Sequence, residues 1–448
     1  MSESRPADFI RQGASARGSA RRGPPGVRRA AELRPSSPER SADAAQASLA
    51  LHNLRGVAIV FVLMMHAFIA YLGSVDVTAG ALDQPPYHWL AFPVLDSRRW
   101  LGFDVFCAWQ DVYLMALMFF LSGVFAGPSL DRDGSLRFLS RRLFKLGGSL
   151  LLGLTVVMPV ALYPVYRLSA PDPNLIGYGR AYLALPFLPN GPMWFLWVLL
   201  ALDGVAAAFH RPARRVLEAG GAIAASLESR PLPAFAVFAA LAFAAYAPLA
   251  AAFTPWRWLA SGPFALQLSR PLLYAAYFFL GLIVGRRGLG RGILRADGFL
   301  ADRWRALLGL CLAALFLWMG LAWLSLKRGG EAEALELLLD ASLVVAGLFG
   351  VLFALSAAFR FGRVRRPLVG AVADKALPLY LLHYAPVVWI QYGLLDLPLP
   401  AVAKGALAFI GALAISWSLA ALWSLAVGMF AGSGRGRPGT LLASPGRR

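Results

Sequence analysis

Long apolar runs recur along the whole of this 448-residue chain, with short polar segments between them. A run of about 20 residues is long enough, as a helix, to cross a hydrocarbon layer about 30 Å thick. The alternating apolar and polar segments that a membrane β-barrel needs are absent. The pattern therefore predicts an all-α polytopic membrane protein with about ten transmembrane helices, at residues 54–73, 107–127, 143–163, 192–209, 233–253, 264–285, 306–326, 335–359, 378–396 and 401–430.

The first of these runs carries a stripe of polar side chains. Arg55 and His66 are eleven residues apart, and because each helical residue turns the chain by about 100°, their directions differ by only roughly 20°. His52 lies on the same face. Ionisable groups at membrane depth are costly and usually face a cavity or a partner. This segment is therefore the first place to look for function.

Composition agrees with a membrane protein, since 58% of the residues are hydrophobic and 15% are charged. The net charge of +19 does not indicate a nucleic-acid partner, because the basic residues follow alternate loops. Loops of the opposite phase are poor in Arg and Lys, and several carry Asp instead. By the positive-inside rule, the even number of spans places both termini in the cytoplasm.

These patterns divide the chain into three parts. Residues 1–46 have no apolar core and predict a disordered, basic cytoplasmic tail without a cleavable signal peptide. Residues 47–430 form one membrane domain, and residues 431–448 form a second cytoplasmic tail. Cys107 and Cys311 both fall in predicted spans, where they are expected to pack as small apolar residues.

The positions of Arg55 and His66 suggest different chemical roles. Arg55 starts at the cytoplasmic boundary, and eleven residues at about 1.5 Å each place His66 about 16 Å deeper, near the midplane. A neutral imidazole there is suited to take a proton from a hydroxyl and return it later. A permanently charged arginine is suited to a phosphate or a carboxylate. The alternative is a histidine bonded to a neighbouring helix and an arginine extended to the interface.

Other polar positions allow a structural and a functional interpretation. The basic residues Arg141 and Arg142 suit an anchor to anionic lipid or a site for the phosphates of a soluble donor. Trp194 is expected to anchor the fourth span at the interface, or to stack on a sugar. Arg270, inside an apolar stretch, needs a partner or a cavity and could contact an acceptor or an acyl carboxylate. His383, in the ninth span, is either a partner of the site or a packing hydrogen bond.

Five sequence features in this order resemble the acyltransferase 3 family of integral membrane acyltransferases, and within it the branch that includes the glucan biosynthesis protein C. They are Arg55 with His66 at this spacing, Phe-Phe-Leu-Ser-Gly at 119–123, the Arg141-Arg142 pair, Gly-Pro-Met-Trp-Phe-Leu-Trp at 191–197 and Pro-Leu-Tyr-Leu-Leu-His at 378–383. The resemblance implies transfer of an acyl group, of acetyl or succinyl type, from cytoplasmic acyl-CoA to a hydroxyl of an extracytoplasmic or lipid-linked carbohydrate. It also implies an inner-membrane enzyme with no bound metal or cofactor, in which His66 matches the essential histidine and Arg55 its paired arginine.

One position departs from the family pattern. Family members usually carry an acidic residue three positions before the arginine, and this chain has His52 there. A compensating carboxylate is therefore sought among Asp111, Asp203, Asp340 and Asp374. A transporter or flippase without catalysis would also place polar groups at the midplane, and a structural subunit of a polysaccharide machine is a third interpretation.

Overall fold

The computed structural model describes residues 38–75, 80–212, 230–255, 257–328 and 332–432. The chain divides into two units, Met1–Ser41 and Ala42–Arg448, and the first is described only from residue 38. The first helix begins at Pro38, so the last residues of the predicted tail, 38–46, are helical. Residues 1–37 and 433–448, where most of the two predicted tails fall, lie outside the described residues.

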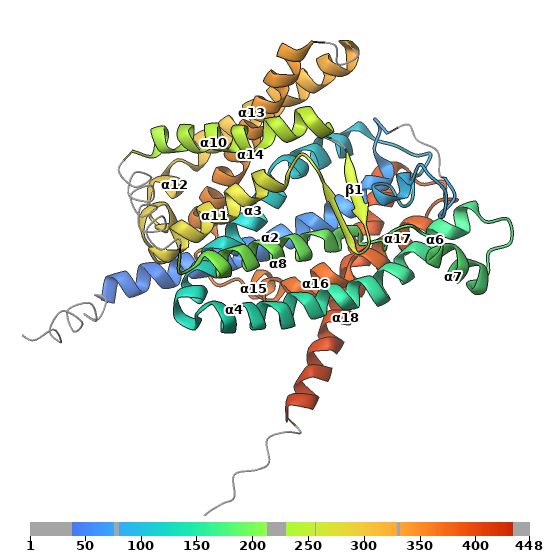
Figure 1. Ribbon diagram of the computed structural model, residues 1–448, viewed down its shortest axis with the longest axis horizontal. Coiled ribbons are helices and arrows are strands. Elements are labelled where there is room, and N and C mark those ends of the chain that lie inside the picture. The colour runs from blue at the N-terminus through green and yellow to red at the C-terminus, as the bar shows by residue number, and fades with distance from the viewer. Residues whose placement is uncertain (1–37, 76–79, 213–229, 256, 329–331, 433–448) are drawn as a thin grey trace, which may run out of the picture. The chain divides into compact units, whose positions relative to one another are not determined.

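The described part of the chain is almost entirely helical (Figure 1). Its longer helices are α2 (Pro38–Phe68), α3 (Leu101–Asp133), α6 (Met158–Ser169), α8 (Trp194–Phe209), α10 (Pro231–Phe253), α11 (Pro271–Arg286), α13 (Trp304–Arg328), α14 (Glu333–Phe361), α17 (Tyr384–Gly393) and α18 (Ala401–Gly432). Shorter helices are α4 (Ser135–Arg142), α5 (Gly148–Leu152), α7 (Leu175–Leu183), α12 (Phe299–Asp302), α15 (Pro367–Asp374) and α16 (Ala376–Leu382). Two π-helical turns, η4 (Leu143–Gly147) and η5 (Gly153–Val157), join α4, α5 and α6 into one continuous helical stretch over 135–169. Single 3₁₀ turns lie at Ile69–Tyr71, His88–Leu90, Gly191–Met193 and Gly292–Leu294.

Eight helical stretches among the described residues are long and apolar enough to cross a membrane. They match eight of the predicted runs, so the prediction of an all-α polytopic membrane protein is confirmed. The other two runs, 264–285 and 378–396, are interrupted, and the prediction of a continuous spanning helix is wrong for both.

The run at 264–285 begins as a strand. Its first residues form β2 (Phe264–Gln267), which pairs antiparallel with β1 (Trp258–Ser261). Gly262, at φ +53°, lies in the turn between the strands, and α11 starts only at Pro271, where the missing N–H of proline costs nothing. Short apolar runs do not distinguish a strand from a helix by periodicity, which explains the error.

The run at 378–396 is broken at His383, between α16 and α17. Pro386 has no N–H to donate to the carbonyl of Leu382, so the hydrogen-bond ladder is interrupted there. Helical hydrogen bonds lie on either side of the break, from His383 N to Leu379 O and from Val387 N to His383 O (both 3.1 Å). They join the end of α16 directly to the start of α17. The break places a histidine between the two helices.

Helices α3 and α11 form the central pair of the unit. Gly123 and Gly127 on α3 face Gly281 and Gly285 on α11, and a Cβ at any of them would meet backbone atoms of the other helix. The small-residue pattern thus allows the two backbones to touch. On one side, α3 and α11 share an apolar core with α10, α13 and α14, and on the other they share a second core with α2, α8 and α16.

A buried ion pair holds the long segment between α2 and α3 against α18. Lys404 in the first turn of α18 donates to Asp96 Oδ2 (2.6 Å) and to the carbonyl of Leu395 (2.9 Å). The two charged side chains are 0% and 1% exposed. Asp96 also receives the backbone N–H of Arg98 (2.7 Å). The pair is therefore well enough bonded to be kept out of water.

Candidate active site

His66 lies in the last turn of α2, facing the break between α16 and α17. Its Nδ1 is 2.8 Å from the carbonyl oxygen of Val62, one turn back, and 3.4 Å from Nε2 of His383. The Tyr384 ring meets the His66 ring edge to face, with centroids 5.4 Å apart. Gln391 on α17 donates to the carbonyls of His66 (2.8 Å) and Ala67 (3.1 Å) and ties the end of α2 to α17.

His383 is almost fully buried, at 1% exposure, and its own Nδ1 is 2.7 Å from the carbonyl oxygen of Tyr380. A carbonyl oxygen can only accept a hydrogen bond, so in both histidines the hydrogen sits on Nδ1. The lone pair of His383 Nε2 then faces the Nδ1–H of His66, and the Nε2 of His66 keeps its lone pair for a substrate. The arrangement leaves His66 ready to take a proton and gives its Nδ1–H a buried acceptor.

Arg55 lies at the other end of the same stripe. Its Nη2 is 3.3 Å from Nδ1 of His52 and donates to the carbonyl oxygen of Ala373 at the end of α15 (3.4 Å). Nε2 of His52 is 3.2 Å from Oδ1 of Asp374. The structure therefore joins Asp374, of the four candidate carboxylates, to Arg55 through His52.

Arg55 and Arg142 share a cationic neighbour, Lys145. The charges of Arg55 and Arg142 both act on Lys145, which lies in the π-helical turn η4 directly after α4. Arg142 Nε is 3.3 Å from Oδ2 of Asp203, a carboxylate that is 0% exposed. The neighbouring Arg141 instead pairs with Asp133. The two adjacent arginines thus have different partners, and Arg142 is the one whose charge acts on Lys145 together with that of Arg55.

Arg55 and His66 are separated along one helix face. Eleven residues of helix correspond to about 16 Å. The chain from α15 to the end of α16 runs beside this stretch of α2, because Ala373 contacts Arg55 and His383 contacts His66. Two groups of side chains therefore lie at two levels along α2. We call Arg55, Arg142 and Lys145 the cationic cluster, and His66 and His383 the histidine pair.

The family model described as an acyltransferase domain matches residues 48–421, which include every member of the cationic cluster and of the histidine pair. The chain belongs to the acyltransferase 3 family. It is therefore a multi-pass membrane enzyme that transfers acyl groups. Searches of curated proteins and of solved structures each found no match.

Arg270 of this acyltransferase has a partner within the protein. Its guanidinium, 3% exposed, forms a two-pronged ion pair with Asp111 on α3, with contacts of 2.9 Å to Oδ1 and 2.5 Å to Oδ2. Asp111 is 31% exposed, so one side of the pair is accessible. The pair links α3 to the start of α11. The predicted need of Arg270 for a partner is thereby met, and its predicted contact with substrate stays a prediction.

Trp194 packs against Tyr274, a neighbour of Arg270. Its ring stacks on Tyr274 at 5.6 Å between centroids, and Tyr274 stacks in turn on Phe119 at 4.9 Å. Tyr274 also interacts with Arg270. Two of the predicted substrate residues, Trp194 and Arg270, are thus brought together through a tyrosine, separately from the contacts that surround His66. Stacking of Trp194 on a sugar stays a prediction.

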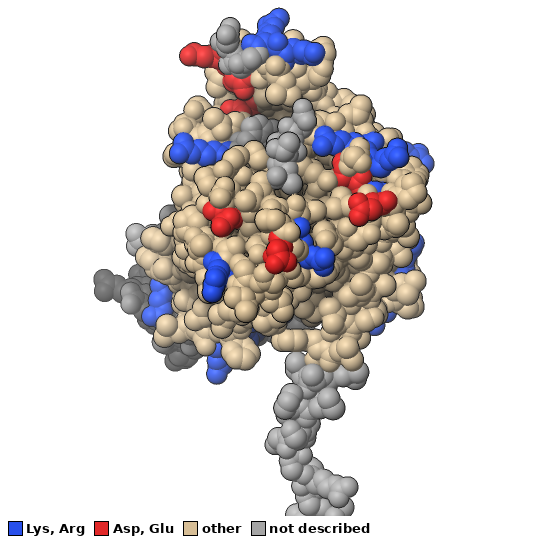
Figure 2. Space-filling view, turned by 90° about the vertical axis from the view of Figure 1, so that its right-hand side faces the viewer, with Lys and Arg blue, Asp and Glu red and all other residues tan. Residues whose placement is uncertain are grey.

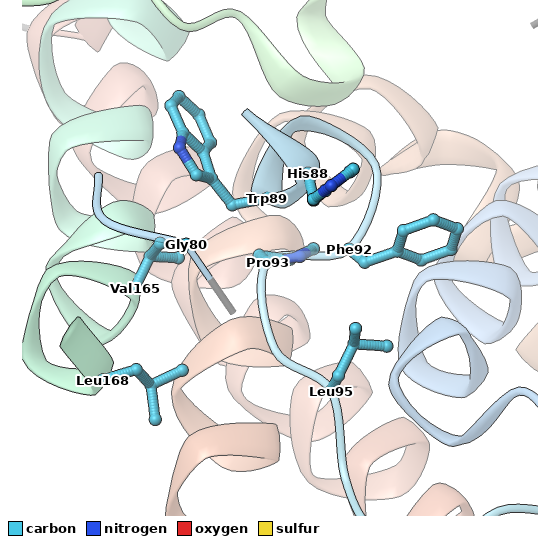
Figure 3. Close-up of a pocket in the computed structure, with 8 residues that line it drawn as sticks. All are labelled: Gly80, His88, Trp89, Phe92, Pro93, Leu95, Val165 and Leu168. Carbon is cyan, nitrogen blue, oxygen red and sulfur yellow. The ribbon is translucent and has the colours of Figure 1, made fainter. Parts of the chain in front are cut away.

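Some residues of the site have no clear signal in the sequence. Tyr384 and Gln391 look like ordinary members of an apolar span, and only the proline that follows His383 marks a break there. Among the described residues, no group of three or more His, Cys, Asp or Glu side chains is placed to hold a metal ion. A hollow lined by His88, Trp89 and Val165, shown in Figure 3, has a volume of about 10 Å³ and accommodates one water molecule, not a sugar.

Proposed function

We propose that this enzyme moves an acetyl- or succinyl-type acyl group from cytoplasmic acyl-CoA to a hydroxyl of an extracytoplasmic or lipid-linked carbohydrate. The observation that carries the proposal is the free Nε2 lone pair of His66, held in a fixed direction by Val62 and His383. A general base must present such a lone pair to the hydroxyl proton it removes.

The proposed orientation puts the cationic cluster on the cytoplasmic side of an inner membrane, with both termini cytoplasmic. Arg141 and Arg142 lie in the last turn of α4 and Arg286 in the last turn of α11. Ion pairs of Arg141 with Asp133 and of Arg286 with Asp131 bring these helix ends to the end of α3. Figure 2 shows the face at the right-hand side of Figure 1, where basic and acidic groups lie next to each other. The gathering of arginines at the ends of α4 and α11 supports the orientation through the positive-inside rule.

Acyl-CoA fits the two levels of the site. Its phosphates and its thioester lie at opposite ends of a long flexible arm, so phosphates at Arg55 place the thioester deeper in the membrane. The helical rise of α2 sets the distance between Arg55 and His66 at about 16 Å, and the arm of acyl-CoA has to span this distance. Arginine is the usual partner of phosphate, because its planar group forms paired hydrogen bonds.

The chemical step follows from the state of His66. Nε2 takes the proton of the acceptor hydroxyl while the oxygen attacks the thioester carbonyl carbon. The resulting imidazolium keeps its Nδ1–H bonds to Val62 and His383, which become stronger because the donor is now charged. When the tetrahedral intermediate collapses, the C–S bond breaks and Nε2 returns the proton to the sulfur, giving the ester and free CoA.

The experiment compares His66→Ala with His88→Ala in membranes that contain the acceptor. His88 lies in the segment between α2 and α3 and serves as a matched histidine control. We expect the parent and His88→Ala to consume acetyl-CoA or succinyl-CoA and His66→Ala to lose this activity. Equal consumption by His66→Ala would refute the role of His66. A parent that consumes neither donor but moves a carbohydrate across the bilayer would establish the transporter instead.

A further inference from the structure

The guanidinium of Arg55 is joined to Asp374 by a histidine. His52 is three residues before Arg55 on α2, and its two ring nitrogens contact different partners: Nδ1 is 3.3 Å from Arg55 Nη2, and Nε2 is 3.2 Å from Asp374 Oδ1. The His52 side chain is 30% exposed and Asp374 is 72% exposed. The bridge therefore lies at the surface end of the stripe.

The direction of both hydrogen bonds follows from the chemistry of arginine. A guanidinium only donates, so Nδ1 of His52 must accept and carries no hydrogen. The neutral ring then has its hydrogen on Nε2, and it donates this hydrogen to Asp374. The order Arg55, His52, Asp374 is a chain of donors and acceptors that runs in one direction. An imidazolium at residue 52 would place an N–H against Arg55 and break the chain.

The end of α15 is held closely against this part of α2. A Cβ at Gly56 would lie 2.9 Å from the backbone nitrogen of Ala373, so only a glycine allows the two helices to touch there. The carbonyl of Ala373 accepts a second hydrogen bond from the same Nη2 of Arg55 (3.4 Å). Both contacts of Arg55 with α15 and His52 therefore use one amino group of the guanidinium.

A negative tether matters at this position, because Lys145, a second cation, lies within electrostatic range of Arg55. The charges of Arg55 and Arg142 act unfavourably on Lys145, and like charges in a cluster repel one another. Asp203 pairs with Arg142 from one side of the cluster. Asp374 is the carboxylate that reaches Arg55 from the other side, through His52.

We propose that His52 and Asp374 are positioning residues that hold Arg55 ready for the phosphate groups of the acyl donor. The proposal rests on the proposed function, in which Arg55 binds those phosphates. His52 accepts from Arg55, Asp374 fixes the tautomer that allows this, and neither touches the reacting atoms. The loss of either residue weakens donor binding and leaves the chemical step at His66 intact.

The kinetic test measures kcat and the KM for acetyl-CoA and succinyl-CoA in His52→Ala, Asp374→Ala and Asp374→Asn. One hydrogen bond contributes modestly, so we expect the donor KM to rise about two- to tenfold with little change in kcat. Asp374→Asn keeps an oxygen that accepts from His52 but loses the negative charge, so its donor KM should lie between those of the parent and of Asp374→Ala. Asp297→Ala is the matched control, since Asp297 is an exposed carboxylate paired with Arg295.

We call the hydrogen-bond chain from Arg55 through His52 to Asp374 the relay. A double replacement distinguishes an effect of Asp374 through this relay from a direct effect of Asp374 on the donor. In His52→Asp, the new carboxylate pairs directly with Arg55 at i, i+3. Adding Asp374→Ala to His52→Asp should then leave the donor KM unchanged. If Asp374→Ala costs as much in the His52→Asp background as in the parent, Asp374 acts on the donor directly and the relay is wrong. Unchanged KM values in all the single variants would overturn it as well.

A spectroscopic measurement tests the relay without any activity. The chain has five histidines, so ¹⁵N spectra of the histidine-labelled protein are simple enough to assign with the His52→Ala variant. We expect His52 with its hydrogen on Nε2, and a shift of this signal in Asp374→Ala. A hydrogen on Nδ1 of His52 in the parent would refute the relay. If neither donor is consumed by the parent, the proposed function fails, and this spectrum alone decides the relay.

Discussion

Replacing His383 by alanine removes the second of two acceptors around the Nδ1–H of His66, the first being the Val62 carbonyl. In the parent, Nδ1 of His66 is 3.4 Å from Nε2 of His383, and this contact strengthens once His66 has taken the proton and become a charged donor. Hydrogen bonds to charged groups contribute about 1.5–3 kcal/mol, and each 1.4 kcal/mol is about tenfold in rate. Because Val62 still accepts from the same hydrogen, we expect the lower end of this range, a fall in kcat of about tenfold in His383→Ala. The donor KM should hardly change, because the cationic cluster lies about 16 Å away.

The assay follows the release of free CoA thiol in membranes that contain the acceptor, at several donor concentrations. His383→Gln is the informative companion, because its side-chain oxygen can accept from His66 and should recover part of the lost kcat. His210→Ala serves as a histidine control, since His210 lies just after α8 near Asp131. A His383→Ala enzyme that keeps more than half of the parental kcat would refute the idea that His383 supports His66.

Three further predictions concern the fold and the cationic cluster. Lys404→Ala leaves Asp96 buried without its cation and should lower the free energy of unfolding by about 3–5 kcal/mol, seen as a lower Tm in detergent; an unchanged Tm would contradict the importance of this pair. Gly281→Ala puts a methyl group against the backbone of α3 and should lower the Tm clearly, whereas Gly320→Ala, which has open space around it, should not; equal effects would argue against the close packing of α3 and α11. Arg142→Ala should raise the donor KM about tenfold, and a parental KM would exclude this arginine from the donor site.

The sequence predicts well those features of this enzyme that depend on a single helix. The stripe of His52, Arg55 and His66 depends only on helical periodicity, and the structure keeps all three on the side of α2 that faces α15 to α17. The eight uninterrupted spans likewise follow from hydropathy alone. These features need no knowledge of which helices are neighbours.

The rest depends on contacts between distant parts of the chain. His66 and His383 are 317 residues apart, and no periodicity indicates that their ring nitrogens meet. The choice of Asp374 among four carboxylates needs the position of α15 against α2, which Gly56 permits. The strand β2 is hidden in an apolar run, because its residues are as hydrophobic as those of the helix that follows.

The most direct test of the central claim follows the acyl group itself. Membranes containing the parent enzyme are incubated with ¹³C-labelled acetyl-CoA or succinyl-CoA, and the carbohydrates are analysed by mass spectrometry before and after mild base, which cleaves esters. We predict that the label appears on carbohydrate as a base-labile ester with the parent and is absent with His66→Ala. Labelled ester formed equally by His66→Ala, or no labelled ester with the parent, would contradict the account.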